Sequence, residues 1–429
     1  MLTISVTIFL LVLLALGTPV AFSLAIAGVA GLFAIGGMDM VLGVLQTTPF
    51  SAANSYELIS VPMFLLMAEF VILSGVADDL FEAASAWVGR VPGGLAMATA
   101  IAGAGFGAIS GSSTAAAATL SATTIPAMLK QGYEPKLACG VVAISGTLAM
   151  LIPPSIALVL YGIIAGANIG ELLIGGVIPG ILVTLTIIAT VWYLVWRDPS
   201  RAPPGRAYTL REKIMSLKVV GPMIFLFMAV TGLIYSGVAT PTEASGIGAF
   251  GAFILAIKAG KVNFSSVQHA LVKASHTSCM IVMIILGAHI FGYFFTLTQT
   301  TQQLVAWIGT LNISHWWIIA FILLGYFVLG CLMDQVAILI LTVPIVLPLV
   351  KAMGFDPVWF GVIVIVMAEV GLVTPPVGLN VFVVARYTGR PLTEIFHGVG
   401  PHVVAHLILV AILVAFPEII LWLPSTMRS

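Results

Sequence analysis

The segment GFGAISGSSTAAAATLSATTIP, residues 105–126, places a run of hydroxyl groups and glycines inside a very apolar chain. The chain has 429 residues, of which 60% are hydrophobic and only 7% are charged, and its mean hydropathy is +1.18. Soluble domains carry about 25% charged residues. Apolar runs recur from Leu2 to Leu423, and runs of about 20 residues can cross a hydrocarbon core of about 30 Å as helices. The composition therefore predicts an all-α polytopic membrane protein.

The chain also repeats itself with a shift of 222 residues. This shift aligns six of its 23 prolines with another proline, whereas chance would align about 0.6. The aligned pairs are Pro19 with Pro241, Pro126 with Pro348, Pro135 with Pro357, Pro153 and Pro154 with Pro375 and Pro376, and Pro179 with Pro401. The sequence therefore predicts two homologous halves, 1–196 and 219–429, joined by a linker at 197–218.

The linker, RDPSRAPPGRAYTLREKIMSLK, carries six of the sixteen Lys and Arg residues. Basic loops of membrane proteins stay in the cytoplasm, and this placement orients the other segments. Arg90 and Lys130 then share the cytoplasmic side, so the chain between them must enter the membrane and return. The halves acquire opposite orientations, which predicts the inverted repeat of secondary transporters, with about ten spans and both termini in the periplasm.

Two further segments are assigned from composition. Residues 1–22 lack a cationic start, because the first basic residue is Arg90, and this predicts a retained span instead of a cleaved signal peptide. The stretch NFSSVQHALVK, residues 263–273, has apolar residues at helical spacing and predicts an interfacial amphipathic helix.

Each half is expected to contain one re-entrant hairpin and one broken helix. The first hairpin is placed at about 91–129, because its two arms of about 16 residues are short for full spans. The second is placed at about 304–350, where the chain enters from the periplasmic face around CLMDQVA. The broken helices, at about 137–166 and 358–385, are interrupted by the double prolines of LIPPSIAL and LVTPPVGLN. Proline removes a helical hydrogen bond, and unpaired backbone groups are tolerated in a bilayer only where they line a cavity or bind a ligand. The hydroxyl-rich segment is therefore expected to form a hairpin tip that faces a break.

Oxygen atoms at these tips and breaks suit sodium, a hard cation that is best held by about five or six oxygens. The expected ligands in the first half are Ser110, Gly111, Ser112, Ser113, Ser145, Gly146, Thr147 and Pro153. In the second half they are Gly330, Asp334, Glu369, Gly371, Thr374 and Gly378. Asp334 is the sharpest candidate, because an acid near the middle of a membrane is costly and functional by default. For Glu369, a structural hydrogen bond to the backbone is an equal alternative.

The half-helices that follow each tip present partial positive charge at their N-termini, which suits an anionic substrate. The expected substrate contacts are Ser112, Ser113, Asp334, Gln335, Asn380 and Arg386. For Arg386 the sequence alone favours a cytoplasmic snorkelling anchor over a substrate role.

Four motifs resemble one family over essentially the whole chain. They are GAISGSSTAAAATLSATTIPAMLKQGYEP, LIPPSIALVLYGIIAGANIGELLIGGVIPG, LMDQVAILILTVPIVLPLVKAMGFDPVWFGVI and GLVTPPVGLNVFVVA. They look like the large membrane subunit of TRAP transporters (tripartite ATP-independent periplasmic transporters, DctM family), within the wider ion-transporter superfamily. Met367 departs from the family, in which many members have Asn two residues before the Glu of this span.

The resemblance implies a sodium-driven importer of organic acids in a bacterial inner membrane, with sodium as coupling ion and no cofactor. It implies two protein partners, a small membrane subunit of four helices and a soluble periplasmic substrate-binding protein. It also implies that a transport domain of hairpins and broken helices moves as an elevator against a scaffold. Sodium would bind where the hairpin tips face the breaks.

Other functions stay open on the sequence. A self-sufficient ion-coupled carboxylate carrier, without a binding protein, would have the same inverted repeat. A channel fits less well, because hairpins and half-helix breaks suit occlusion of a solute. An inert scaffold subunit would bind no sodium. A membrane enzyme would need a nucleophile with its base or a metal-ligand set, and none is visible. We expect no nucleic-acid partner; the lipid bilayer is the surroundings of the chain.

Overall fold

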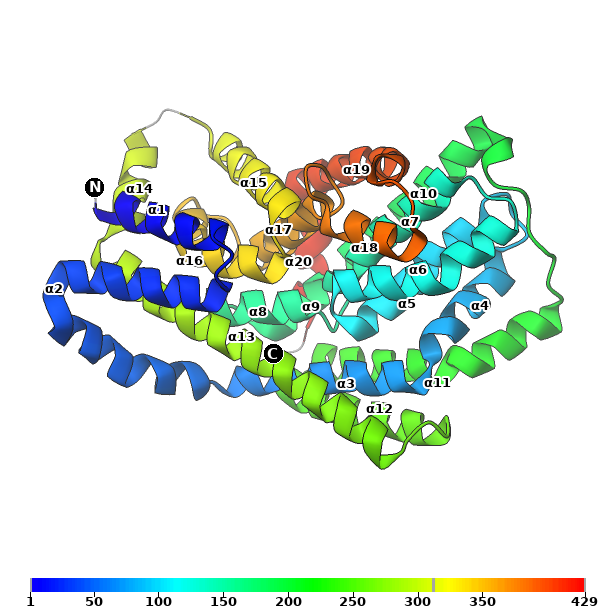
Figure 1. Cartoon of the computed structure of the whole chain (residues 1–429), viewed down its shortest axis with the longest axis horizontal. Coiled ribbons are helices and arrows are strands. Elements are labelled where there is room, and N and C mark those ends of the chain that lie inside the picture. The colour runs from blue at the N-terminus through cyan, green and yellow to red at the C-terminus, as the bar shows by residue number, and fades with distance from the viewer. Residues whose placement is uncertain (1, 311–312, 428–429) are drawn as a thin grey trace.

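The computed structural model describes residues 2–310 and 313–427, and this part of the chain folds into helices without any strand (Figure 1). Met1 and residues 428–429 lie outside the described residues. The prediction that both chain ends are periplasmic concerns these residues. Eight helical segments of the described part are long and apolar enough to cross a membrane. Five further apolar helices have only 10–17 residues, and they include the hairpin arm Gly94–Ser110 and parts of both broken helices. Both arms of the second hairpin, His315–Leu332 and Gln335–Ala352, have 18 residues and belong to the eight, so they are longer than the short arms expected.

The first half and the start of the linker contain thirteen helical elements among the described residues. They are α1 (Leu2–Ala15), α2 (Val20–Ala53), η1 (Tyr56–Ile59), α3 (Ser60–Ser74), α4 (Val76–Val88), α5 (Gly94–Ser110), α6 (Ser113–Lys130), α7 (Pro135–Gly146), η2 (Thr147–Met150), α8 (Ile156–Ala165), α9 (Ile169–Gly175), α10 (Val177–Arg197) and η3 (Pro199–Arg201).

The second half contributes ten helices in the described residues. They are α11 (Leu210–Tyr235), α12 (Pro241–Lys258), α13 (Phe264–Leu297), α14 (Thr300–Thr310), α15 (His315–Leu332), α16 (Gln335–Ala352), α17 (Pro357–Gly371), α18 (Leu379–Thr388), α19 (Leu392–Ala415) and α20 (Glu418–Ser425).

The helix bounds follow the repeat closely. Shifting α6 by the 222 residues of the sequence repeat gives 335–352, which are the bounds of α16. The peptide bonds Pro153–Pro154 and Pro375–Pro376, at equivalent positions, are both cis. In Figure 1 the pair α5 and α6 and the pair α15 and α16 approach the middle of the molecule from opposite ends. The arrangement is an inverted repeat with one helical hairpin and one broken helix in each half.

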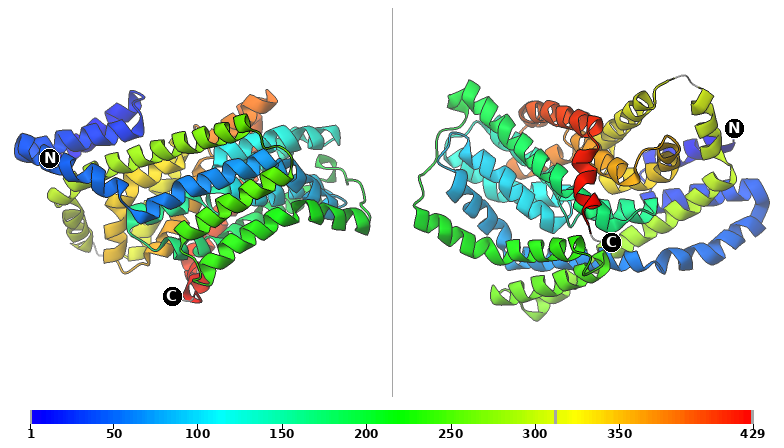
Figure 2. Two further views of the ribbon diagram at one scale, coloured as in Figure 1. Left: turned by 90° about the horizontal axis from the view of Figure 1, so that it is seen from below. Right: turned by 180° about the vertical axis from the view of Figure 1, so that it is seen from behind.

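A second group of helices flanks these hairpins and contains long helices that lie side by side (Figure 2). In it α13 packs against α2 and α3, while α12 packs against α3 and α11. The helix α2 bends sharply at Gly36 and Gly37, where Gly37 has φ 67°. A positive φ of this kind costs glycine little, so the chain can turn back on itself there. The part of α2 before this bend corresponds to α12, and the part after it, with α3, corresponds to α13.

The segment 263–273 does not form a separate interfacial helix, so that expectation is wrong. It is the first third of α13, which runs unbroken from Phe264 to Leu297. Ala270 and Ala274 are buried, and Lys273 pairs with Glu69 of α3 at 2.8 Å. The contact with the neighbouring helix therefore runs through Ala270, Ala274 and Lys273, whereas the apolar residues Phe264 and Leu271 are 87% and 46% exposed.

Several boundaries differ from those expected. The first span was expected over 1–22, but α1 ends at Ala15 and the chain turns at Gly17, which has φ 81°. The second hairpin was placed at about 304–350, whereas its arms are α15 and α16, and residues 300–310 form the separate helix α14. The helix α11 begins at Leu210, inside the expected linker, because Thr209 and Glu212 form a reciprocal capping box there.

The linker crosses the base of the first hairpin at the edge of the molecule (Figure 1). The backbone N–H of Glu134 donates to the carbonyl of Arg201 at 2.7 Å, and the N–H of Gly205 donates to the carbonyl of Gly89 at 3.1 Å. Ala202, between these two bonds, is fully buried. Through these two bonds the linker contacts the residues that follow α4 and α6. The start and the end of the first hairpin therefore lie on the same side of the molecule, as the sequence predicts for the segment 91–129.

Candidate functional site

The hydroxyl-rich segment forms the tip of the first hairpin, as expected. Ser110 ends α5, and Gly111 turns the chain with φ 55°. Ser112 caps α6 by accepting a hydrogen bond from the N–H of Ala115 at 3.4 Å. A cap of this kind satisfies one of the free N–H groups at a helix start.

Ser113, at the same tip, joins the two halves of the protein. Its hydroxyl donates to Glu369 Oε2 of α17 at 2.7 Å, across 256 residues of sequence. Glu369 is only 3% exposed, and its other oxygen, Oε1, is buried without a hydrogen-bond partner. A Cβ on Gly146 of α7 would lie 2.9 Å from the carbonyl oxygen of Ser113. The glycine therefore allows the first break to approach the tip closely.

The first break lies behind this tip and is buried. Ser145, Thr147 and Pro153 are all buried. The hydroxyl of Thr147 donates to Ile144 O at 2.6 Å within its own turn, whereas Ser145 Oγ has no partner. Of these side-chain oxygens, that of Ser145 is free to bind a ligand.

The second hairpin meets the second break through glycines. A Cβ on Gly330 of α15 would lie 2.4 Å from the carbonyl oxygen of Ala368, and one on Gly371 would lie 2.6 Å from Gly330 Cα. Gly378, with φ 64°, donates its N–H to Cys331 O at 3.4 Å. These contacts bring the backbone of the tip against the backbone of the break. Thr374, by contrast, uses its hydroxyl on Val370 O in the preceding turn, at 2.7 Å.

Asp334 and Gln335, which follow each other at the second tip, face different surroundings. Asp334 caps α16 by accepting from the N–H of Val336 at 3.1 Å, and its side chain is exposed. It lines a largely apolar cavity of about 460 Å³ between α16, the start of α2 and the part of α13 around His276. Gln335 is fully buried; its amide donates to Ile365 O at 3.4 Å, and its Oε1 has no partner.

Asn380, in α18, makes a second contact between the halves. Its side-chain amide donates to Ala143 O of α7 at 3.4 Å, and its Oδ1 is buried without a partner. The first half therefore contacts the second at the hairpin tip, through Ser113, and at its broken helix, through Ala143.

Four side chains expected to bind ions or substrate thus carry a buried oxygen without a partner: Ser145, Gln335, Glu369 and Asn380. They lie on tips and breaks that contact one another. A buried polar atom without a partner costs free energy of about 1–3 kcal/mol. Hydroxyl, amide and carboxylate oxygens are the ligands that hard cations prefer. The described residues contain no group of three or more His, Cys, Asp or Glu side chains able to hold a metal ion.

Arg386 lines a different cavity from Asp334. This cavity has a volume of about 620 Å³ and lies between α18 and the first turn of α6, with Thr114, Ala115 and Tyr387 in its wall. The side chains of Arg386 and Tyr387 are exposed to it. The guanidinium and the start of α6 both favour an anion. The expected substrate contacts are therefore divided, because Arg386 lies beside the first tip, whereas Asp334 lies at the second tip and lines another cavity.

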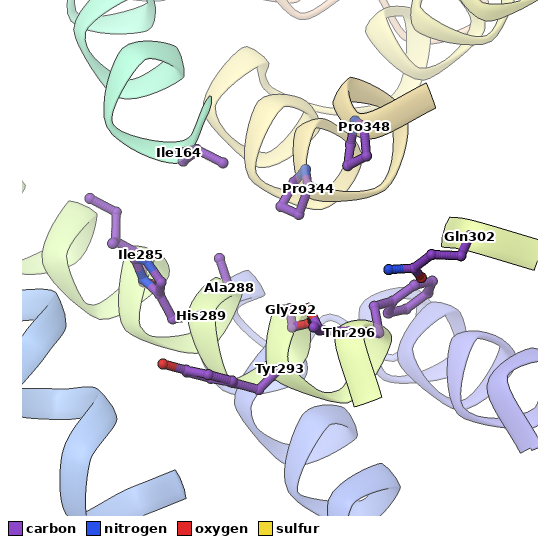
Figure 3. A pocket seen from close by; sticks show the side chains of 11 residues that line it. Ile164, Ile285, Ala288, His289, Gly292, Tyr293, Thr296, Gln302, Pro344 and Pro348 are labelled. Atoms are coloured by element: carbon purple, nitrogen blue, oxygen red, sulfur yellow. Dashed lines mark hydrogen bonds between the residues drawn. The ribbon is translucent and has the colours of Figure 1, made fainter. Parts of the chain in front are cut away.

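Two features of the site could not be expected from motifs alone. Thr114 and Tyr387 line the cavity of Arg386 but were not expected as contacts. They follow Ser113 and Arg386 directly in the chain, and this was the only indication that the sequence offered. A third cavity, of about 300 Å³, separates α13 from α16 (Figure 3). His289, Tyr293 and Gln302 line one side of it, and the prolines of α16 line the other. No motif of the sequence indicated this cavity.

Known proteins share this architecture and sequence. Residues 7–419 match the family described as tripartite ATP-independent periplasmic transporter, DctM component. The C4-dicarboxylate TRAP transporter large permease protein DctM of Pseudomonas aeruginosa is 34% identical over 377 residues, which are 88% of each chain. The isethionate TRAP transporter permease protein DctMQ of Oleidesulfovibrio alaskensis is 32% identical over 95% of this chain and 64% of its own length.

The fold also resembles a crystal structure of the Alcanivorax borkumensis YdaH transporter, with a TM-score of 0.68. The similarity covers 97% of this chain and 98% of that one, at 15% sequence identity, and therefore concerns the fold alone. The sequence matches go further, because one family covers residues 7–419 and its curated members are TRAP permease proteins. The chain belongs to the DctM family, the large permease component of the tripartite ATP-independent periplasmic transporters.

Proposed function

We propose that this chain is the large transmembrane subunit of a sodium-coupled, binding-protein-dependent importer of an organic acid that works by an elevator mechanism. The observation that carries the proposal is the set of four buried oxygens without partners, on Ser145, Gln335, Glu369 and Asn380. These atoms lie on hairpin tips and broken helices, which is where a cation can be enclosed by oxygen and released again.

Sodium is the cargo whose gradient drives transport in this proposal. Glu369 is a carboxylate with one oxygen held by Ser113 and the other unpaired. An uncompensated buried charge is strongly unfavourable, so a cation next to Glu369 would stabilise the closed contact between the first tip and α17. The carrier would then move with sodium bound and resist movement without it.

The substrate is an anion with a carboxylate or related acid group. Support comes from Arg386 and the start of α6, which together line the cavity of about 620 Å³. The relatives described above are named for C4-dicarboxylates and isethionate, which are small organic acids. Ser112, Ser113, Gln335 and Asn380 remain the expected polar contacts. Asp334, in its separate cavity, is better suited to the cation than to an acidic substrate.

The moving part would consist of α5–α8 and α15–α18, and the long helices α2, α3 and α11–α13 would form the scaffold. The packing of α13 on α2 and α3, and of α12 on α3 and α11, gives the scaffold a continuous set of contacts. The cavity of Figure 3 lies on the border between the two groups, where α13 faces α16.

The protein would act in a bacterial inner membrane, with both termini in the periplasm, and would need two partners. One is a small membrane subunit of four helices. Support comes from the relative named DctMQ, because this chain spans only 64% of its length. The other partner is a periplasmic binding protein that delivers the acid.

The test is uptake by proteoliposomes that contain this chain, its small subunit and its binding protein, with a C4-dicarboxylate as first probe. We expect uptake only with an inward sodium gradient and with the binding protein present. Uptake without the binding protein would instead support a self-sufficient carrier. Uptake that is unchanged when potassium replaces sodium would refute sodium coupling.

A further inference from the structure

A polar groove lies at the linker end of the molecule, away from the hairpin tips. It has a volume of about 620 Å³ and is enclosed by the start of α7, the end of α10 and the first turns of α19. Its wall includes the cationic side chains Lys136, Arg197 and Arg201, together with Glu134 and Asp198. The transport site described above uses none of these residues.

The charges in the groove are not balanced evenly. Arg201 lies between the two acids, with its Nε 3.5 Å from Glu134 Oε2 and 3.2 Å from Asp198 Oδ2. Ser200 also donates to Asp198 Oδ1 at 2.6 Å. Within the described residues, Lys136 and Arg197 have no ion-pair partner. Lys136 and Arg197 therefore face the groove without a carboxylate oxygen within 4.0 Å, and the two acids of its wall are already paired with Arg201.

The surface beside the groove is suited to lipid. Trp192 and Trp196 stack on the outside of α10 with ring centroids 6.2 Å apart, and they are 56% and 69% exposed. Tyr193, which lines the groove, stands between them in the sequence. Further along α10, Ile181 and Leu185 are 54% and 52% exposed. Tryptophan and tyrosine gather at the level of lipid headgroups, and the exposed aliphatic residues continue from there along the acyl chains.

We propose that this groove binds the phosphate group of an anionic phospholipid. Lys136 and Arg197 would contact the phosphate, and the acyl chains would lie along the exposed face of α10. Basic pockets between membrane helices on the cytoplasmic side bind anionic headgroups in this way.

The experiment measures lipid binding, not transport, so its outcome is independent of the proposed function. Delipidated protein in detergent is titrated with phosphatidylglycerol, and bound lipid is counted by native mass spectrometry. Each surface cation contributes about 1 kcal/mol to binding of an anionic lipid, which corresponds to about fivefold in the dissociation constant. We therefore expect K136Q and R197Q to weaken binding about fivefold each, and the double variant about 25-fold.

The matched control is the pair Arg211→Gln and Lys218→Gln. Both residues are exposed on α11, outside the groove. The two substitutions remove the same total charge as the groove variant does. We expect this double variant to bind phosphatidylglycerol within about twofold of the natural protein. A second variant, K136R with R197K, keeps the charges and should retain the lipid, which excludes misfolding as the cause of a loss.

Two results would overturn the proposal. One is equal phosphatidylglycerol binding by the groove variant and the α11 control. The other is displacement of the lipid by a large excess of inorganic phosphate, which would identify a site for soluble anions. Weaker binding of phosphatidylcholine, which carries the same phosphate without net charge, would support an anionic lipid.

Discussion

Replacing Ser113 by alanine tests the contact between the two halves most directly. The change removes the hydroxyl that donates to Glu369 Oε2 at 2.7 Å. The carboxylate is 3% exposed, and its Oε1 already lacks a partner. A hydrogen bond to a charged group contributes about 1.5–3 kcal/mol, which corresponds to about 10- to 150-fold in an equilibrium constant. If Glu369 holds sodium, the half-saturating sodium concentration for uptake should rise at least about tenfold.

Ser121→Ala is the matched control, because it changes the same residue type in the same helix. Ser121 is 3% exposed, and its hydroxyl donates to Ala117 O within α6 at 2.6 Å. Loss of such a local bond has little effect, so the sodium dependence should stay within about twofold of the natural protein. The assay is sodium-dependent uptake by the three-component proteoliposomes, with protein content equalised. Identical sodium dependence of S113A and S121A would refute the role assigned to Glu369.

Three further predictions concern other parts of the site. Gly330→Ala should lower the thermal unfolding midpoint in detergent, because its Cβ would lie 2.4 Å from Ala368 O and overpacking costs about 1–3 kcal/mol. In the control variant Gly325→Ala, in the same helix, the new Cβ meets nothing within 4 Å, and the midpoint should rise slightly. Equal midpoints for the two variants would contradict the close approach of tip and break. Arg386→Gln should raise the KM for a dicarboxylate about fivefold or more by removing one charge from the cavity wall, while the sodium dependence of uptake stays constant. An unchanged KM would contradict a substrate contact and favour the role of a membrane anchor for Arg386. Asp334→Asn should reduce sodium-dependent uptake severely at normal expression, since the carboxylate is expected to meet the cation; natural rates would remove Asp334 from the ion path.

Much of the architecture could be predicted, because prolines that interrupt helices and basic residues in loops are recognisable in the sequence itself. The double prolines located both breaks, and the shift that aligns them also reproduces the bounds of α16 from those of α6. The same shift, applied to 91–129, gives 313–351, which is much closer to the arms α15 and α16 than the expected 304–350. The start of the second hairpin was misplaced because apolar composition does not distinguish α14 from a hairpin arm. The repeat was the better guide.

The contacts of individual residues were harder to predict. The repeat places Ser112 opposite Asp334 and Thr147 opposite Glu369 in the alignment, but an alignment contains no information on which half contacts which. Ser113 was expected near the first break, and it does lie against Gly146, but its hydroxyl reaches Glu369 in the other half. The two breaks also differ, since Pro153 is buried and Pro375 is exposed. Such differences arise from long-range packing, to which local patterns are insensitive.

The bonds from Ser113 to Glu369 and from Asn380 to Ala143 have a consequence for the origin of the molecule. Neither half of the chain can complete its own centre, because each supplies groups that only the other half satisfies. A gene encoding a single half would therefore make a working centre only as an antiparallel homodimer, with copies inserted in both directions. Fusion of two such genes through a basic connecting segment would fix one copy in each direction and allow the copies to differ, as they do at the equivalent tip positions Ser112 and Asp334.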